Sequence, residues 1–378
     1  MSEMRSGNTA GETGEHSPRL RLYDGLQILI EHRGPYVQRK PTMNDVARLA
    51  EVGTMTVSRV LNGSARVSEE ATERVRAAIE KLNYRPNELA RALRGERSRT
   101  IGLILPYLYD PFFAVCAHAV SAVAQQRGYS VIMTTSNENQ ETEYAAVIQM
   151  LQRHVDGLIL IPSSRGKSRI NRALLGKTQV VVFDRPLGDP SFDTVLVQNQ
   201  FGSRRMVQHL IGHGHKAISF MGLSRSIFTM DARFHGYRKA MSEAGLKSDA
   251  CFQCATMAST LEAIQTRLAS KKKPTAYFTA NTLVTRFVFA ALSQLGIHIP
   301  SEVALAGFDD FELADFTGPP LTVVRQPAEE MGRVAANQLF DRLERGETPR
   351  TGNRVVLPVE IVLRRSCGCK NKSAVIMH

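Results

Sequence analysis

The sequence predicts an α/β protein in which a small all-α helix-turn-helix module precedes a larger domain built on parallel β-sheet. Residues 41–95 are rich in helical patterns joined by short loops. Residues 100–365 instead alternate apolar runs of strand length with stretches of helical period. Strands that alternate with helices form βαβ units, whose strands lie parallel in one sheet.

Composition limits the classes of protein to which the chain can belong. It has 378 residues, of which 43% are hydrophobic, enough for more than one buried core. No apolar run approaches about 18 residues and residues 1–17 show no signal peptide, so we expect no membrane span and no secretion. Five cysteines are too few for a disulfide framework in a chain of this size. We therefore expect a cytoplasmic protein.

The net charge of +12 is densest near the N-terminus. Residues 39–99 carry 13 Lys and Arg against 8 Asp and Glu, whereas residues 1–38 sum to −1 and are expected to be a disordered leader. A basic module ahead of a larger and milder domain indicates contact with a polyanion. A basic protein that is merely soluble would have the same net charge, so charge alone does not decide between the two.

The first expected helix begins after Thr42, and Asp45 at its third position closes a capping box. A tight turn at Glu51–Gly53 leads into a second helix from Thr54 to about Leu61. Two short helices joined by a tight turn that contains Gly are typical of the helix-turn-helix. The side chains expected to pack between the helices are Val46, Leu49 and Ala50 of the first and Val57, Val60 and Leu61 of the second.

A third helix, capped by Ser68, is expected to cover the first two with Val75, Ile79 and Leu82. The second helix then keeps an outward face that consists of Thr54, Met55, Ser58 and Arg59. A helix of this kind fits the major groove of DNA, where Arg59 can donate two hydrogen bonds to guanine. The alternative for Arg59, taken without the surrounding pattern, is a solvated surface arginine.

Residues Asn87–Arg94 can form two helical turns with Leu89 and Leu93 on one face. A helix of this length is not stable alone in water, which suits a segment that folds on binding. A leucine beside arginines is what a wedge in the DNA minor groove requires. The alternative is a charged linker between domains.

Residues 39–99 resemble the DNA-binding region of the LacI/GalR family of bacterial repressors. The resemblance rests on the order and spacing of DVA at 45–47, TVSRVLNG at 56–63, VSEEA at 67–71 and YRPN at 84–87. It implies a two-fold homodimer on double-stranded, pseudo-palindromic operator DNA, with a small-molecule effector and no cofactor. The residues that it assigns to DNA binding are Thr54, Met55, Thr56, Ser58, Arg59, Asn62, Leu89, Ala90 and Leu93.

Two residues in the turn depart from the family pattern. Glu51 stands where the family usually has Gly, and Gly53 stands where it usually has Ser. The second change removes a hydroxyl that would contact a DNA phosphate. The resemblance implies a helix-turn-helix domain at 39–84, a hinge helix and linker at 85–99, and an effector-binding and dimerisation domain at 100–365.

The resemblance continues to about residue 365 and implies a fold similar to periplasmic sugar-binding proteins, with two α/β lobes crossed by three strands and a ligand in the cleft. Ligands of such sheets sit at the carboxyl ends of the strands. The runs that we expect to be strands are Ile101–Leu105, Ser130–Thr134, Gly157–Ile161, Val180–Phe183, Ala217–Met221, Ala276–Thr279 and Val303–Ala306. Polar or aromatic residues follow several of them, including Asp110–Phe113, Ser136, Asn137, Asp184, Arg185, Asn281 and Asp309.

A cleft with aromatic rings, carboxylates, an amide and a planar cation suits a polyhydroxylated or heterocyclic ligand. The expected effector contacts are Phe112, Phe113, Asp184, Arg233, Asn281, Phe308, Asp309 and Gln326. For any one of them, core packing or helix capping is the alternative. Asn281-Thr282 and Gln198-Asn199 each lack a carboxylate that the family usually has, so the ligand contacts should differ from the common pattern.

Several other motifs do not indicate a site. Gly166-Lys167-Ser168 resembles the end of a P-loop, but Ile161 stands where that loop needs Gly. His213 and His215 show no third metal ligand, and nothing brings Cys251 and Cys254 to Cys367 and Cys369. We therefore expect no metal site and a frayed end over Arg364–His378, of which residues 366–378 form a tail.

The sequence thus predicts a DNA-binding transcriptional regulator, a repressor controlled by a sugar or sugar derivative. One alternative is a sugar-binding transport protein without direct action on DNA. Another is an α/β enzyme with a fused DNA-binding domain, but no motif marks a catalytic arrangement, so we expect no enzyme activity.

Overall fold

The computed structural model describes residues 41–61, 66–85, 97–163, 168–346, 351–369 and 376–377. It divides the chain into two compact units, residues 1–86 and 87–378. The expected leader at 1–38 lies outside the described residues, as do four of the expected DNA contacts, Asn62, Leu89, Ala90 and Leu93.

The first unit is a three-helix module made of α1 (Met43–Leu49), α2 (Thr54–Leu61) and α3 (Glu69–Leu82). Both predicted N-terminal caps are present: the Thr42 N–H donates to the Asp45 carboxylate at 2.9 Å, and the Ala71 N–H donates to Ser68 Oγ at 3.3 Å. These bonds satisfy backbone donors that the first helical turn leaves free. The buried core of the module is Val46, Ala47, Ala50, Val57, Val75, Ala78 and Tyr84.

The prediction that Leu49 belongs to this core is wrong. Leu49 is 41% exposed, and Ala47 is buried in its place. Val46, Ala47 and Ala50 occupy one face of α1, whereas Leu49 is the last residue of the helix and turns toward solvent. A small alanine at that position allows α2 and α3 to approach α1 closely.

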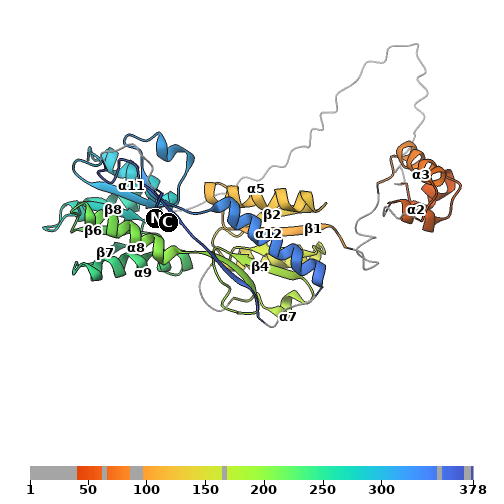
Figure 1. Ribbon diagram of the computed structural model, residues 1–378, viewed down its shortest axis with the longest axis horizontal. Coiled ribbons are helices and arrows are strands. Elements are labelled where there is room, and N and C mark those ends of the chain that lie inside the picture. Colours follow the sequence, from red (N-terminus) through yellow and green to blue (C-terminus); the bar gives the residue numbers. More distant parts are fainter. Residues whose placement is uncertain are drawn as a thin grey trace, which may run out of the picture. The chain divides into compact units, whose positions relative to one another are not determined.

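The second unit contains two sheets, as Figure 1 shows. Among the described residues the first sheet has six parallel strands in the order β11-β5-β4-β3-β1-β2. Its strands are β1 (Thr100–Leu105), β2 (Ser130–Thr135), β3 (Gly157–Leu160), β4 (Gln179–Phe183), β5 (Asp193–Val197) and β11 (Arg354–Leu357). Strands β3, β4 and β5 are buried along their whole length, as expected of a parallel sheet covered on both faces.

The second sheet has seven described strands in the order β13-β12-β10-β9-β8-β6-β7. They are β6 (Ile218–Met221), β7 (Asp249–Cys251), β8 (Ala276–Thr279), β9 (Ala304–Phe308), β10 (Thr322–Arg325), β12 (Glu360–Val362) and β13 (Ile376–Met377). Strand β12 runs antiparallel to both of its neighbours, β10 and β13, whereas the other described pairs in this sheet are parallel. The chain passes between the sheets after β5, after β10 and after β11, which are the three crossings that the family resemblance implied.

Helices cover both sheets. They are α5 (Pro111–Gln126), α6 (Gln140–Gln152), α7 (Arg172–Leu175), α8 (Asn199–Gly212), α9 (Phe228–Glu243), α10 (Met257–Leu268), α11 (Thr282–Gln294), the short 3-10 helix η1 (Glu312–Asp315) and α12 (Ala328–Arg345). No helix among the described residues has the length and apolar character needed to cross a membrane.

Helices α5 and α12 lie side by side although they are far apart in the sequence (Figure 1). Their backbones approach so closely that a side chain at Gly332 of α12 would come within 2.4 Å of the Cys116 carbonyl oxygen of α5. The chain therefore returns to the first sheet after its second crossing. There α12 packs against the lobe that is built on this first sheet.

The expectation of a frayed end from Arg364 is wrong for Arg364–Cys369. Ser366 is fully buried, accepts a hydrogen bond from the Thr322 N–H at 2.8 Å and donates to the Leu305 carbonyl at 2.6 Å. Arg364 pairs with Asp310 at 3.0 Å. These contacts attach the segment after β12 to β9 and β10.

Candidate functional site

Helix α2 presents an exposed polar face in the first unit. Thr54 and Arg59 are exposed, Met55 is 67% exposed, and Thr56 and Ser58 are half-buried. Val57 is fully buried on the opposite face. The five predicted DNA contacts that the structure describes therefore lie on or beside a surface that solvent, or a base edge, can reach.

The turn before α2 shows why the family usually has Gly at the position of Glu51. Glu51 adopts φ +53°, in the left-handed region that favours glycine. The chain is thus held in a glycine-type conformation by a residue with a side chain. At Gly53, by contrast, a Cβ would meet no atom within 4 Å, so the position has room for the serine that the family usually has there.

A cavity that opens to solvent lies in the second unit. Seven of the eight predicted effector residues line it: Phe112, Phe113, Asp184, Arg233, Asn281, Asp309 and Gln326. The eighth, Phe308, is not among the lining residues. It is fully buried, and the Arg233 guanidinium lies 3.8 Å above its ring.

Arg233 is the centre of a network on the side of the second sheet. Its Nε donates to Asn199 Oδ1 at 2.7 Å, and its Nη1 donates to the Ala280 carbonyl at 2.6 Å and to Asp309 Oδ2 at 3.3 Å. Gln326 Nε2 donates to the other oxygen of Asp309 at 2.5 Å. Burial raises the pKa of Asp309, while Arg233 and Gln326 act in the opposite direction.

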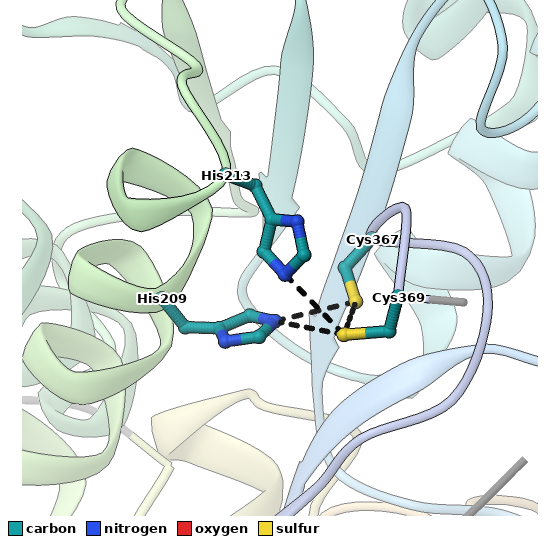
Figure 2. A group of neighbouring side chains, drawn as sticks. All are labelled: His209, His213, Cys367 and Cys369. Atoms are coloured by element: carbon teal, nitrogen blue, oxygen red, sulfur yellow. Dashed lines mark hydrogen bonds between the residues drawn. The ribbon is translucent and has the colours of Figure 1, made fainter. Parts of the chain in front are cut away.

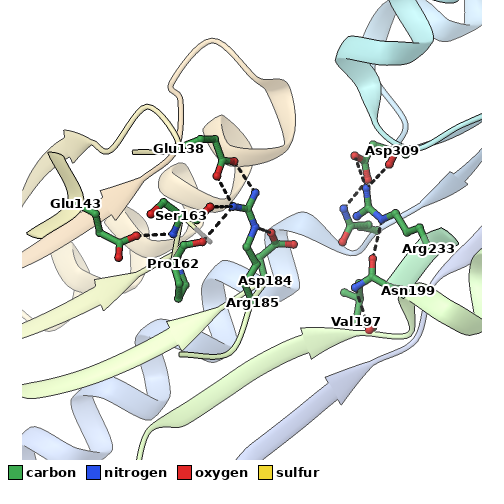
Figure 3. A network of polar contacts seen from close by, with 12 residues as sticks. Glu138, Glu143, Pro162, Ser163, Asp184, Arg185, Val197, Asn199, Arg233 and Asp309 are labelled. Carbon is green, nitrogen blue, oxygen red and sulfur yellow. Dashed lines mark hydrogen bonds and ion pairs between the residues drawn. The ribbon is translucent and has the colours of Figure 1, made fainter. Parts of the chain in front are cut away.

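Arg185 is the centre of a second network, on the side of the first sheet. Its Nη1 and Nη2 donate to the two oxygens of Glu138 at 2.6 and 2.7 Å, and its Nε donates to Asp184 at 3.2 Å. Burial disfavours the charged guanidinium, but Glu138 and Asp184 outweigh it and raise the pKa of Arg185. Figure 3 shows the two networks, which border the same cavity from opposite lobes.

Asp110 adds a fourth carboxylate to the cavity. It also caps α5, because its Oδ1 accepts the Phe112 N–H at 3.0 Å. Burial, together with the nearby charge of Asp309, raises the pKa of Asp110 to about 6. A ligand that donates hydrogen bonds, or carries positive charge, would favour its ionised form.

Sequence reasoning missed six polar or aromatic lining residues as contacts: Tyr107, Tyr109, Asp110, Glu138, Arg185 and Thr229. Glu138 directly follows Asn137, the last residue that we assigned to the end of this strand. Both residues have positive φ and lie in a turn. Arg185 was noted after its strand but not assigned to the ligand. The two tyrosines follow β1, and a rule that takes every aromatic residue after a strand would have found them.

Comparison with known proteins agrees with this architecture. Residues 42–87 match the family model described as "Bacterial regulatory proteins, lacI family", and residues 207–367 match a "Periplasmic binding protein-like domain". The "HTH-type transcriptional repressor PurR" of Aliivibrio salmonicida is 30% identical over 315 residues, which are 80% of this chain and 92% of that protein. The chain belongs to the LacI family. The "Ribose operon repressor" of Escherichia coli is 33% identical over 80% of this chain and 93% of its own length.

Solved structures show the same similarity. The lac repressor dimer bound to operator and the anti-inducer ONPF has a TM-score of 0.77 and 25% identity, over 87% of this chain and 99% of that one. A complex of the transcriptional regulator CelR with cellobiose has a TM-score of 0.64 and 30% identity, over 86% of this chain and 99% of that one.

The family membership confirms the predicted class of function. The chain is a DNA-binding transcriptional regulator controlled by a small molecule, and not an enzyme. The transport-protein alternative is not favoured, because the lacI-type DNA-binding region is present at residues 42–87.

Proposed function

We propose that this regulator is a repressor whose affinity for operator DNA is set by a sugar or a sugar derivative. The observation that carries the proposal is the cavity bordered by two arginine–carboxylate networks and by aromatic rings. Hydroxyl groups both donate and accept hydrogen bonds, so a polyol can satisfy carboxylates and guanidinium groups at the same time. Aromatic rings can stack on the apolar faces of a sugar ring.

An acceptor that lacks a partner supports the same ligand class. Among the described residues, Gln326 Oε1 is buried without a hydrogen-bond partner, while the Nε2 of the same side chain is held by Asp309. A buried polar atom without a partner costs free energy of about 1–3 kcal/mol. A ligand hydroxyl that donates to this oxygen would recover that energy on binding.

Named relatives point in the same direction. Both curated relatives reported above are repressors, one of them of a ribose operon, and one structural neighbour is complexed with cellobiose. We infer that α2 reads double-stranded operator DNA in the cytoplasm. A second copy of the chain would read the other half of a pseudo-palindromic site, as a two-fold homodimer requires.

A thermal-shift screen of the full chain tests the ligand class. The panel holds pentoses, hexoses, disaccharides, sugar acids, nucleosides and purines at equal concentrations. A ligand at about 100 times its dissociation constant stabilises the folded state by about 2.7 kcal/mol. Stabilisation by one group of sugars supports the proposal, whereas stabilisation only by nucleosides or purines would overturn it.

Tyr109 tests whether an aromatic ring of the cavity stacks on the ligand, with Tyr109→Phe as the matched control. It lines the cavity yet is 67% exposed, so its replacement should leave the fold intact. We expect Tyr109→Ala to weaken binding of the sugar found in the screen about ten-fold, and Tyr109→Phe to bind nearly as the parent does, because stacking needs only the ring. Calorimetry that gives equal affinity for all three chains would exclude Tyr109 as a stacking residue.

A further inference from the structure

Four side chains with metal-binding atoms meet outside the effector cavity. They are His209 and His213 from α8 and the residue after it, and Cys367 and Cys369 from the turn after β12. Figure 2 shows their ring nitrogens and sulfurs pointing toward one another. In the part of the chain that the structure describes, no other group of three or more His, Cys, Asp and Glu residues is placed to hold a metal ion.

The distances between the atoms fit a tetrahedral ion. Cys367 Sγ and Cys369 Sγ are 3.3 Å apart, His209 Nε2 lies 3.3 and 3.6 Å from the two sulfurs, and His213 Nε2 lies 3.3 Å from Cys369 Sγ. Around Zn²⁺, with Zn–S of about 2.3 Å and Zn–N of about 2.0 Å, tetrahedral angles place neighbouring ligand atoms about 3.3–3.8 Å apart. Four of the six distances between the ligand atoms are therefore within about half an ångström of the tetrahedral values, and all four atoms lie within 4.8 Å of one another.

Local structure brings each pair of ligands together. His209 and His213 are four residues apart, so they lie on the same side at the end of α8, and their rings are 4.6 Å apart. Between the cysteines, Gly368 adopts φ +94°, a conformation that side chains rarely adopt. That glycine reverses the chain so that both sulfurs face the histidines.

A hydrogen bond to one sulfur favours its role as a ligand. Thr322 Oγ1 accepts the Arg364 N–H at 2.9 Å, which leaves its own hydrogen to be donated to Cys367 Sγ at 3.1 Å. A donor aimed at the sulfur favours the thiolate, the form that binds metals. Outer contacts of this kind orient the ligands of metal sites. Cys367 is fully buried and His213 is exposed, so one side of the cluster is open to an arriving ion.

We infer that His209, His213, Cys367 and Cys369 form a binding site for Zn²⁺ or a similarly soft divalent transition ion. Two imidazoles and two thiolates make a complete tetrahedral set, which is typical of structural rather than catalytic zinc. The groupings weighed from the sequence were His213 with His215, and Cys251 and Cys254 with Cys367 and Cys369. Neither forms a metal-binding group among the described residues. His215 instead contacts Thr275 Oγ1 at 3.1 Å.

The site would clamp the segment after β12 to α8. Helix α8 also carries Asn199, the partner of Arg233 in the effector cavity, at its other end. His209 lies ten positions after Asn199 along the helix, about 15 Å at 1.5 Å per residue. The ion would therefore stabilise the lobe without touching the effector.

Metal titration of the untagged full chain, first reduced and stripped with a chelator, tests the site. We expect one Zn²⁺ per chain, release of protons from the thiols, and a higher melting temperature. Co²⁺ should give the absorption of a tetrahedral ion with thiolate-to-metal charge transfer. Absence of stoichiometric Zn²⁺ binding to the reduced chain, or recovery of the cysteines only as a disulfide, would overturn the inference.

Variants separate this site from adventitious binding. Cys369→Ser and His213→Ala change half-buried or exposed residues, so both chains should fold, and each should lower Zn²⁺ affinity at least 100-fold and remove the Co²⁺ spectrum. His118→Ala replaces an exposed histidine of α5 outside the cluster and should leave both measurements unchanged. Equal Zn²⁺ affinity in all these variants would show that the ion binds elsewhere.

Discussion

Some of the strained backbone positions of this protein lie at its functional surfaces. Asp184 and Asp309 both line the cavity, and both adopt left-handed φ values, +64° and +76°. Residues with side chains cost free energy in that region unless the surroundings enforce it. At Asp309 the enforcing contacts are visible, because its N–H donates to the Val324 carbonyl at 2.8 Å and its carboxylate is held by Arg233. The strand ends are thus fixed in advance for a ligand.

Glu51 is strained in the same way, without a ligand contact to compensate. We expect Glu51→Gly to stabilise the helix-turn-helix module by about 0.5–1 kcal/mol, because φ +53° costs a glycine little. Hydrogen exchange of the α1–α3 amides in the full chain measures this local free energy of unfolding. Gly53→Ala, at a position without positive φ, is the control. Unchanged exchange in Glu51→Gly would mean that the Glu51 side chain makes up for its backbone conformation.

Asp110 should make stability depend on pH. Its pKa in the folded chain is about 6, above its ordinary value of 3.8, so the folded state holds this proton more tightly than the unfolded state. The stabilisation is complete below about pH 4 and is lost as pH rises through about 6. Relative to Asp110→Asn, which keeps the cap on α5, the parent should lose on the order of 1–2 kcal/mol between pH 4 and 7.

Urea unfolding of both chains at several pH values checks this expectation. The difference between the two free energies of unfolding should move in favour of Asp110→Asn as pH rises. Parallel curves for the two chains would show that Asp110 ionises in the folded state at its ordinary pKa.

Elements with strong local signals were predictable, and elements held by distant contacts were not. The three helices of the first unit have clear apolar periods and all three were predicted, α1 and α3 with their N-terminal caps. Six strands have only two to five residues and were not among the predicted strands: β5, β7, β10, β11, β12 and β13. Their identity depends on neighbours in the sheet, which the sequence does not display.

The candidate sites divide in the same way. Residues at the ends of predicted strands, such as Asp184 and Asp309, were found because parallel strands bring their carboxyl ends to one edge. The His–Cys cluster was not found, because His209 and Cys367 are 158 residues apart and neither belongs to a recognised metal motif. Packing of α8 against the second sheet brings them together.

Helix α2 should carry the sequence specificity of the regulator. Arg59 is exposed on the same face as Met55, so its removal should leave the helix folded. We expect Arg59→Ala to cost about 1–3 kcal/mol on operator DNA and much less on random DNA, since a bidentate base contact would be lost. Fluorescence anisotropy with both DNAs at one fixed salt concentration measures the two losses. If they were equal, Arg59 would contact phosphate and not a base.

The two lobes of the second unit are joined by three passages of the chain, and the cavity is lined from both lobes. Asp110, Asp184 and Arg185 come from the lobe of the first sheet, whereas Arg233, Asn281 and Asp309 come from that of the second. A ligand that binds both sets at once interacts differently with a closed and an open arrangement. Only such a difference allows a ligand to shift a conformational equilibrium.

Effector and operator should therefore affect each other's binding. We expect a saturating amount of the sugar found in the thermal-shift screen to change operator affinity by about 5–150-fold, and operator to change sugar affinity by the same factor, because the coupling free energy is reciprocal. Anisotropy with and without sugar gives the first factor, and calorimetry with and without operator gives the second. Tyr109→Ala should need more sugar for the same effect, while its operator affinity without sugar stays that of the parent. An operator affinity that does not respond to saturating sugar would mean that the cavity binds its ligand without control of DNA binding.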